Sequence, residues 1–227
     1  MTNVAGQYPS LSSVAPSETG AADLAAALAE QERLRRDLHH QVTNSLQIIA
    51  SLVALQARDS RSAAVRQLHD VIQAQIQTLT LVQRWQYLGE ADACVDLAGM
   101  LAELCAALEA GLVSARHDRV AIACTAAALP LAPELAIPVG FLITELALLA
   151  SQQAPPGRLQ LAVAAAQAAT GISLTVHTSA FAGPDTLAGA DTATARIIRA
   201  MAQQLGGGLQ HDAMTGSYEI GFAGASG

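Results

Sequence analysis

Aromatic residues and positive charge are both scarce in this chain. Phe, Trp and Tyr make up 3% of its 227 residues, whereas hydrophobic residues make up 52%, and much of that share is Ala. A chain rich in Ala favours helices, because Ala loses no side-chain entropy when a helix forms. Only 12 Lys and Arg stand against 19 Asp and Glu, for a formal net charge of −7. Nonspecific nucleic-acid binding is not expected, because it requires clustered basic side chains.

Cysteine and long apolar runs are scarce too. Cys94, Cys105 and Cys124 form an odd set without metal-ligand spacing. We interpret them as small buried apolar residues in a reducing compartment. The stretch 135–150 comes nearest to a membrane span, but Glu145 interrupts it. The N-terminus lacks the basic and apolar regions of a signal peptide, so we expect a cytoplasmic protein that does not engage a membrane.

Composition divides the chain into three regions. Residues 1–18 are rich in Ser, Pro, Gly and Thr without periodicity, which predicts a disordered N-terminal tail. Residues 19–89 carry two amphipathic helix patterns joined by a short polar connection at 59–62, which predicts a long antiparallel helical hairpin. Two such helices cannot fully cover each other's apolar stripes, so we expect a homodimer in which two hairpins form a four-helix bundle. The stripe residues are Leu24, Leu28, Leu34, Leu38, Val42, Ile49 and Leu52, then Val65, Leu68, Ile72, Ile76, Leu79 and Val82.

Residues 90–227 mix helix and strand patterns. The predicted helices are 96–112, 134–153 and 192–205, and the predicted strands are 119–125, 158–165, 171–178, 209–212 and 217–222. The helix at 134–153 is apolar nearly all round, so it should be buried. A loop containing Gly and Pro is expected at 182–190. Helices combined with mostly sequential strands indicate an α+β fold.

One face of the first predicted helix is polar throughout. Residues three, four and seven apart share a side of a helix. Around His40 these residues are Arg36, Asp37, Thr43, Asn44 and Gln47. His40 is therefore predicted to point to solvent, where a neutral imidazole is a good nucleophile. Spacing alone also fits a plain solvated helix face.

Phosphoryl transfer gives these residue types a set of roles, since it needs mainly positioning and charge stabilisation. In that interpretation Arg36 steadies phosphate charge and Asp37 orients the imidazole of His40. Asn44 donates a hydrogen bond to a phosphoryl oxygen or to a water molecule, and Gln47 lies on the same face.

The segment 38–58 also resembles a known family. It reads LHHQVTNSLQIIASLVALQAR and is similar to the phosphoacceptor box of one subfamily of sensor histidine kinases, roughly H-H-R-V-K-N-N-L-Q-I-I-x-S-L-L-x-L-Q-A-R. The second His of that pair is the family's phosphoacceptor and corresponds to His40. The Arg and Lys that follow it in the family are Gln41 and Thr43 here, and both differences remove positive charge beside the site.

The second domain resembles the ATP-binding domain of the same kinases, without its nucleotide chemistry. Residues 135–146 are similar to the approach to the family's N-box, whose Asn ligates magnesium, but 149–153 read LASQQ. Leucine cannot ligate a hard cation that requires oxygen. Residues 174–183 replace the family's D-x-G-x-G, which reads adenine, with LTVHTSAFAG, whereas 195–207 again look like the closing helix and glycine turn. The resemblance implies a degenerate ATP-binding domain that binds neither ATP nor a metal.

Together these features predict a histidine phosphotransferase rather than an active kinase. A phospho-aspartate on the receiver domain of a response regulator or hybrid histidine kinase would donate to His40, which would pass the phosphoryl group to a second receiver. The Mg²⁺ would come from the receiver. Two alternatives stay open. One is a response-regulator phosphatase in which Asn44, helped by Gln41 or Thr43, positions water, and the other is a non-catalytic dimeric scaffold.

Overall fold

The computed structural model describes residues 18–58, 62–88, 94–113 and 117–224. Our prediction of a disordered tail at 1–18 lies outside these residues except for Glu18, which begins a helix, and that of a polar connection at 59–62 lies outside them except for Ser62. The chain divides into two compact units, residues 1–42 and residues 43–227, and each is described by itself.

Two long helices begin the described chain. Helix α1 spans Glu18–Arg58 and helix α2 spans Ala63–Leu88, which confirms both helices predicted there. Several apolar side chains of their stripes are exposed to solvent. These are Leu24, Leu28, Leu34, Val42, Ile49 and Leu52 of α1, together with Val65 and Leu68 of α2.

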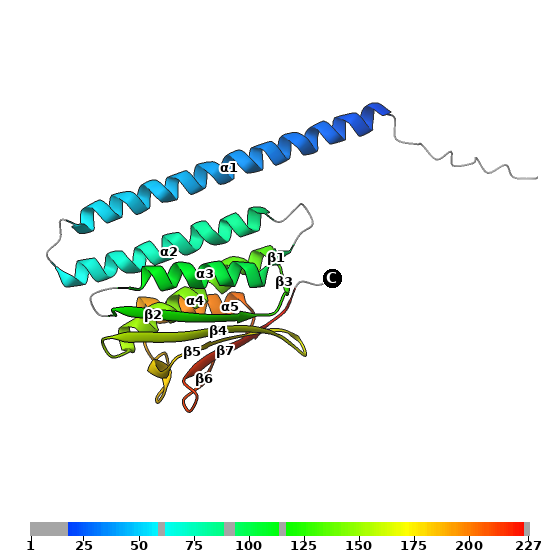
Figure 1. Cartoon of the computed structure of the whole chain (residues 1–227). Helices are drawn as coiled ribbons and strands as arrows, with labels where there is room; N and C mark the ends of the chain where they lie inside the picture. Colours follow the sequence, from blue (N-terminus) through cyan, green and yellow to red (C-terminus); the bar gives the residue numbers. More distant parts are fainter. Residues whose placement is uncertain (1–17, 59–61, 89–93, 114–116, 225–227) are drawn as a thin grey trace, which may run out of the picture. The chain divides into compact units, whose positions relative to one another are not determined.

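A five-stranded mixed sheet forms the body of the second unit (Figure 1). Its spatial order is β2 (Arg119–Ala126), β4 (Arg158–Ala168), β5 (Gly171–His177), β7 (Ser217–Phe222) and β6 (Gln210–Asp212). Strands β2 and β4 are parallel, and the other neighbouring pairs are antiparallel. Strand β2 is therefore an edge strand. One of its amides, Ile122 N–H, is capped by Glu109 Oε2 at 2.8 Å.

Helices lie on one side of this sheet (Figure 1). They are α3 (Leu97–Gly111), α4 (Pro133–Gln153) and α5 (Ala193–Gln204), with a short 3-10 helix η1 at Ser179–Phe181. Two short strands that were not predicted, β1 (Val95–Asp96) and β3 (Pro130–Leu131), pair antiparallel to each other. Asp96 then starts α3, because its side chain accepts a hydrogen bond from Ala98 N–H at 3.1 Å. The α+β class is confirmed.

Helix α4 is the central core helix, as its sequence predicted. Most of its residues from Ala136 to Ala150 are buried. It is also long and apolar enough to cross a membrane by length and composition, but 67% of the relevant window is buried inside the protein. Such burial is typical of a core helix in a layered α+β domain, so the apolar character of α4 is explained by packing inside the protein.

Helix α2 packs closely against α4. A Cβ atom on Gly140 would lie 2.7 Å from Val82 Cγ2, so only glycine permits this approach. Thr144 donates its hydroxyl hydrogen to Gly140 O at 2.8 Å, which leaves Thr78 as the donor in the 2.7 Å contact between the two threonine hydroxyls. Both threonines are buried. The second half of the predicted hairpin is thus part of the sheet-containing unit.

Helix α2 also contacts α3 near its C-terminal end. Trp85 Nε1 donates to Glu103 Oε2 at 2.8 Å, and Arg84 forms an ion pair with the same carboxylate. Gly99 leaves space for the indole, since a Cβ there would lie 2.5 Å from Trp85 Cη2. Trp85 therefore serves packing.

Candidate functional site

All seven predicted site residues lie on helix α1. The side chains of Arg36, Asp37, Gln41 and Asn44 are exposed, as a polar helix face requires. The side chains of His40, Thr43 and Gln47 lie outside the described part of the structure. The prediction that His40 faces solvent therefore stays a prediction.

Asp37 has a partner on its own helix. Arg33 Nη1 lies 3.7 Å from Asp37 Oδ2, one turn away, and Arg33 Nη2 donates to Glu30 Oε1 at 2.8 Å. The hydrogen bond from Arg33 lowers the pKa of Glu30. All three side chains are more than half exposed, so these pairs add little stability. The Asp37 carboxylate therefore already has a charged partner in Arg33, in addition to the predicted role of orienting the imidazole of His40.

Helix α4 carries residues 135–146, which resemble the approach to the family's N-box, and Glu145 is the one carboxylate of that segment. Glu145 is completely buried, and its Oε1 accepts a 2.6 Å hydrogen bond from Gln75 Nε2 of α2. The second oxygen, Oε2, is buried with no hydrogen-bond partner. Burial raises the pKa of Glu145, against the opposing effect of the Gln75 hydrogen bond. The carboxyl group therefore belongs to the packing of α2 on α4.

The end of the same segment is tied to a loop. Gln153 Nε2 donates to Thr186 Oγ1 at 2.7 Å, and Leu149 is partly buried against the core. In the family pattern the position of Leu149 belongs to the magnesium-binding Asn. Among the described residues, no group of three or more His, Cys, Asp and Glu side chains is placed to hold a metal ion.

The loop at 182–190 is held by polar contacts to β7 and α5. Tyr218 Oη donates to Asp185 Oδ1 at 2.6 Å, and burial together with that carboxylate raises the pKa of Tyr218 to about 12. Arg199 of α5 donates to Leu187 O at 3.2 Å and to Ala190 O at 2.7 Å. The side chain of Leu187 is buried. These three hydrogen bonds hold the loop against β7 and α5, so the loop covers part of the core.

Two histidines of the second unit satisfy structural roles. His117 is fully buried and its Nε2 lies 2.8 Å from Ser151 O, whereas its Nδ1 has no partner. His211 Nε2 lies 2.8 Å from Phe181 O, and its ring lies 4.7 Å from that of Tyr218. Each imidazole joins two segments of the unit, so neither points to catalysis.

The sequence interpretation missed the polar contacts between α2 and α4. Gln75 and Thr78 lie among apolar positions of α2 and were passed over. The available signal was Glu145 itself, because a carboxylate inside an otherwise apolar helix requires a polar partner on the facing element.

Known proteins share parts of this description. Residues 37–111 match a family model described as histidine kinase. Over these residues the chain is similar to the histidine kinases. The match begins three residues before His40 and ends with α3, so it includes the predicted phosphoacceptor segment at 38–58.

Solved histidine kinases share the fold. The histidine kinase domain of the Erythrobacter litoralis EL346 blue-light activated histidine kinase aligns with a TM-score of 0.57 at 20% identity, over 85% of this chain and 91% of that one. A second structure of the Erythrobacter litoralis EL346 blue-light activated histidine kinase gives 0.57 at 19% identity, over 83% of this chain and 61% of that one. This chain thus spans less than two thirds of the second structure. No curated protein matches the chain.

Proposed function

We propose that this chain is a cytoplasmic histidine phosphotransferase of a two-component phosphorelay, with His40 as the phosphoryl carrier. The histidine kinase match over residues 37–111 carries the proposal, because it includes the segment whose second His corresponds to the family's phosphoacceptor. Histidine kinases act with response regulators, so receiver domains are the partners that the family implies.

The proposed chemistry consists of two in-line transfers. An imidazole nitrogen of His40 attacks the phosphorus of a receiver's aspartyl phosphate, the bond between phosphorus and the carboxylate oxygen breaks, and the carboxylate leaves. The reverse reaction on a second receiver returns the imidazole. The receiver supplies Mg²⁺ to balance the charge of the transferred group. Exposed Asn44, one helical turn after His40 in sequence, offers an amide donor for a phosphoryl oxygen.

Contacts in the second unit support a role without ATP. Leu149 stands where the family has its magnesium-binding Asn, and Glu145 is engaged by Gln75. The 182–190 loop is fastened by Tyr218 and Arg199. In the region where the family binds its nucleotide, these residues make packing contacts with one another. We therefore propose that the phosphoryl group comes from a receiver and not from a nucleotide.

A transfer assay tests the proposal. The chain is incubated with a phosphorylated receiver and Mg²⁺ without ATP, and acid-labile label is followed on wild type, His40→Ala and His39→Ala. We expect label on wild type and His39→Ala and none on His40→Ala. Equal labelling of His40→Ala, or no labelling of wild type by several receivers, refutes the carrier role.

A phosphatase is the second candidate, favoured by the exposure of Asn44. An amide at this position orients water for attack on the receiver's aspartyl phosphate, with Gln41 or Thr43 assisting. Asn44→Ala would then slow the loss of receiver label about 10-fold or more, while His40→Ala would retain most activity. If receivers bind but lose no phosphate with wild type, a non-catalytic scaffold remains.

The exposed apolar stripe of α1 supports a homodimer as part of this proposal. Leu24 of the stripe is 62% exposed, Leu28 58% and Leu52 55%, and Ile48, one helical turn before Leu52, is 61% exposed. A row of exposed apolar side chains this long marks an interaction surface. A second copy of the chain offers the same stripe, and a symmetric four-helix bundle buries both.

A further inference from the structure

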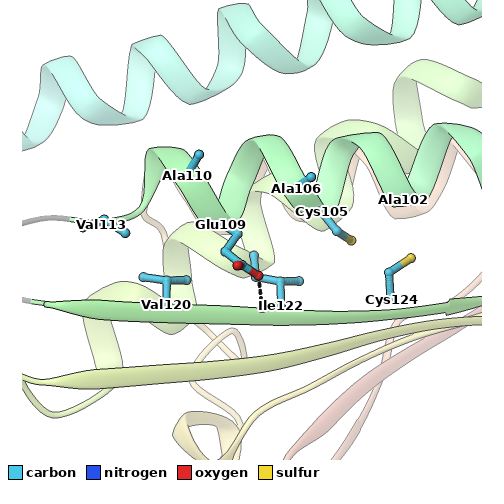
Figure 2. A pocket seen from close by; sticks show the side chains of 9 residues that line it. All are labelled: Ala102, Cys105, Ala106, Glu109, Ala110, Val113, Val120, Ile122 and Cys124. Carbon is cyan, nitrogen blue, oxygen red and sulfur yellow. Dashed lines mark hydrogen bonds between the residues drawn. The ribbon is translucent and has the colours of Figure 1, made fainter.

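An open pocket lies between helix α3 and the edge strand β2 (Figure 2). Its volume is about 400 Å³. Three alanines of α3 line it at intervals of four residues, Ala102, Ala106 and Ala110. Glu109 crosses it to accept a hydrogen bond from Ile122 N–H at 2.8 Å. Strand β2 has no further strand beyond it. The small side chains and the sheet edge together leave the space beneath α3 reachable from solvent.

Two cysteines face each other in this pocket. Cys105 projects from α3 towards the sheet, Cys124 projects from β2 towards the helix, and both sulfur atoms lie in the space between the two elements (Figure 2). Cys105 is 2% exposed, whereas Cys124 is only partly buried. This corrects the sequence interpretation of the cysteines as uniformly buried, since Cys94 is exposed as well.

We propose that Cys105 and Cys124 form a reversible disulfide when the protein meets a hydroperoxide oxidant. Nothing in the phosphotransfer proposal requires this pair, so the two stand independently. Facing thiols on two packed elements, one of them reachable through an open pocket, are the arrangement that such chemistry needs.

The burial of the two thiols assigns their order of reaction. Burial raises the pKa of the Cys105 thiol, with the neighbouring Cys124 and Glu109 adding to the effect. Cys105 therefore stays protonated and shielded, and the more accessible Cys124 reacts first. Its thiolate attacks the terminal oxygen of the hydroperoxide, the O–O bond breaks, and Cys124 becomes a sulfenic acid while the oxidant leaves as an alcohol or water.

The second step closes the disulfide. Cys105 sulfur attacks the sulfenic sulfur of Cys124, the S–O bond breaks, and water leaves with the thiol proton. The two thiols together lose two electrons and two protons, and the hydroperoxide gains them. The product ties α3 to β2 and closes the intervening chain into a covalent loop, which restricts the unfolded chain and raises the unfolding temperature.

Mass spectrometry of a Cys94→Ser variant tests this proposal, because only the pair then remains. The protein is treated with hydrogen peroxide, unfolded, and alkylated with iodoacetamide. We expect a mass loss of about 2 Da and no alkylation, with both alkylation sites restored by dithiothreitol. The oxidised sample should also unfold at a higher temperature than the reduced one.

A Cys94→Ser/Cys105→Ala variant serves as the matched control. It lacks the resolving thiol, so Cys124 should gain oxygen atoms instead of forming a crosslink. The proposal is overturned if the Cys94→Ser protein gains oxygen at Cys124 while Cys105 remains open to alkylation. Disulfides that join two chains instead of these two residues would overturn it as well.

Discussion

At the scale of single residues, the buried carboxyl group of Glu145 makes stability depend on pH. Burial raises its pKa above the usual 4.5, so the folded chain holds the proton more tightly than the unfolded chain. The stability due to protonated Glu145 is fully present below about pH 4.5 and is lost as the pH rises through the folded-state pKa.

Replacing Glu145 with Gln removes that dependence. Gln keeps an oxygen for the Gln75 hydrogen bond, and burying a neutral amide costs less than burying a charge. We expect Glu145→Gln to be more stable than wild type by roughly 1–2 kcal/mol at pH 8, with the difference vanishing near pH 4. Urea unfolding at both pH values, at one protein concentration, measures this.

Glu134→Gln is the control for that substitution. Glu134 is exposed in the first turn of the same helix, where its charge complements the helix dipole. Its loss should cost up to about 0.5 kcal/mol, a change of the opposite sign. Equal pH profiles for Glu145→Gln and wild type would show that the buried carboxyl group does not titrate differently on folding.

At the scale of secondary-structure elements, Gly140 sets the distance between α2 and α4. Ala is the better helix former by about 1 kcal/mol, but its Cβ would lie 2.7 Å from Val82 Cγ2. We expect Gly140→Ala to destabilise the chain by about 1–3 kcal/mol, because a packed interface resists added atoms. Thermal or urea unfolding gives the value.

A double-mutant cycle locates the cause of that loss. Val82→Ala removes the methyl group that the new Cβ meets, so it should cost less in the Gly140→Ala background than in wild type. Gly208→Ala is a suitable control, since a Cβ there meets nothing within 4 Å. Additive effects at positions 82 and 140 would contradict close packing at this point.

The helices and the five strands of the sheet were predictable from local patterns, whereas the two shortest strands and the order of the sheet were not. The patterns at 134–153 and 192–205 became α4 and α5 with ends shifted by one residue, since periodicity and caps are local. Strands β1 and β3 have two residues each, too few to show a period. Strand β2 pairs with β4 although α4 lies between them in the sequence, and no local sequence pattern predicts such a pairing.

The candidate site divides in the same manner. The polar residues around His40 follow from helical spacing and from the resemblance of 38–58. Arg36, Asp37, Gln41 and Asn44 are exposed, as a polar helix face requires, and their roles stay predictions. The ion pair of Asp37 with Arg33 was not predicted. The facing thiols of Cys105 and Cys124 belong to two consecutive elements, α3 and β2, and only the packing of the helix on the strand brings them together.

At the scale of the whole molecule, the proposed homodimer predicts a defined response to charge on α1. Ile48 and Leu52 are neighbours on the helix and more than half exposed. Burying one Leu or Ile is worth about 1.5–3 kcal/mol. We therefore expect Ile48→Asp/Leu52→Asp to weaken self-association by about a hundredfold or more, as measured by sedimentation velocity across a concentration series.

Met214→Asp is the matched control for dimerisation. Met214 is 92% exposed at the turn between β6 and β7, so a charge there should leave self-association unchanged. A wild-type chain that stays monomeric at high concentration would contradict the dimer, and the exposed stripe would then need another partner.

The capped edge of β2 affects how readily one copy of the protein could pair with another through this strand. An uncapped sheet edge can recruit the strand of any neighbouring chain and seed fibres. Glu109 occupies Ile122 N–H and places a negative charge beside it, so an approaching backbone finds a donor already taken and a carboxylate to desolvate. One side chain thereby makes this edge a poorer template for strand pairing between copies of the protein.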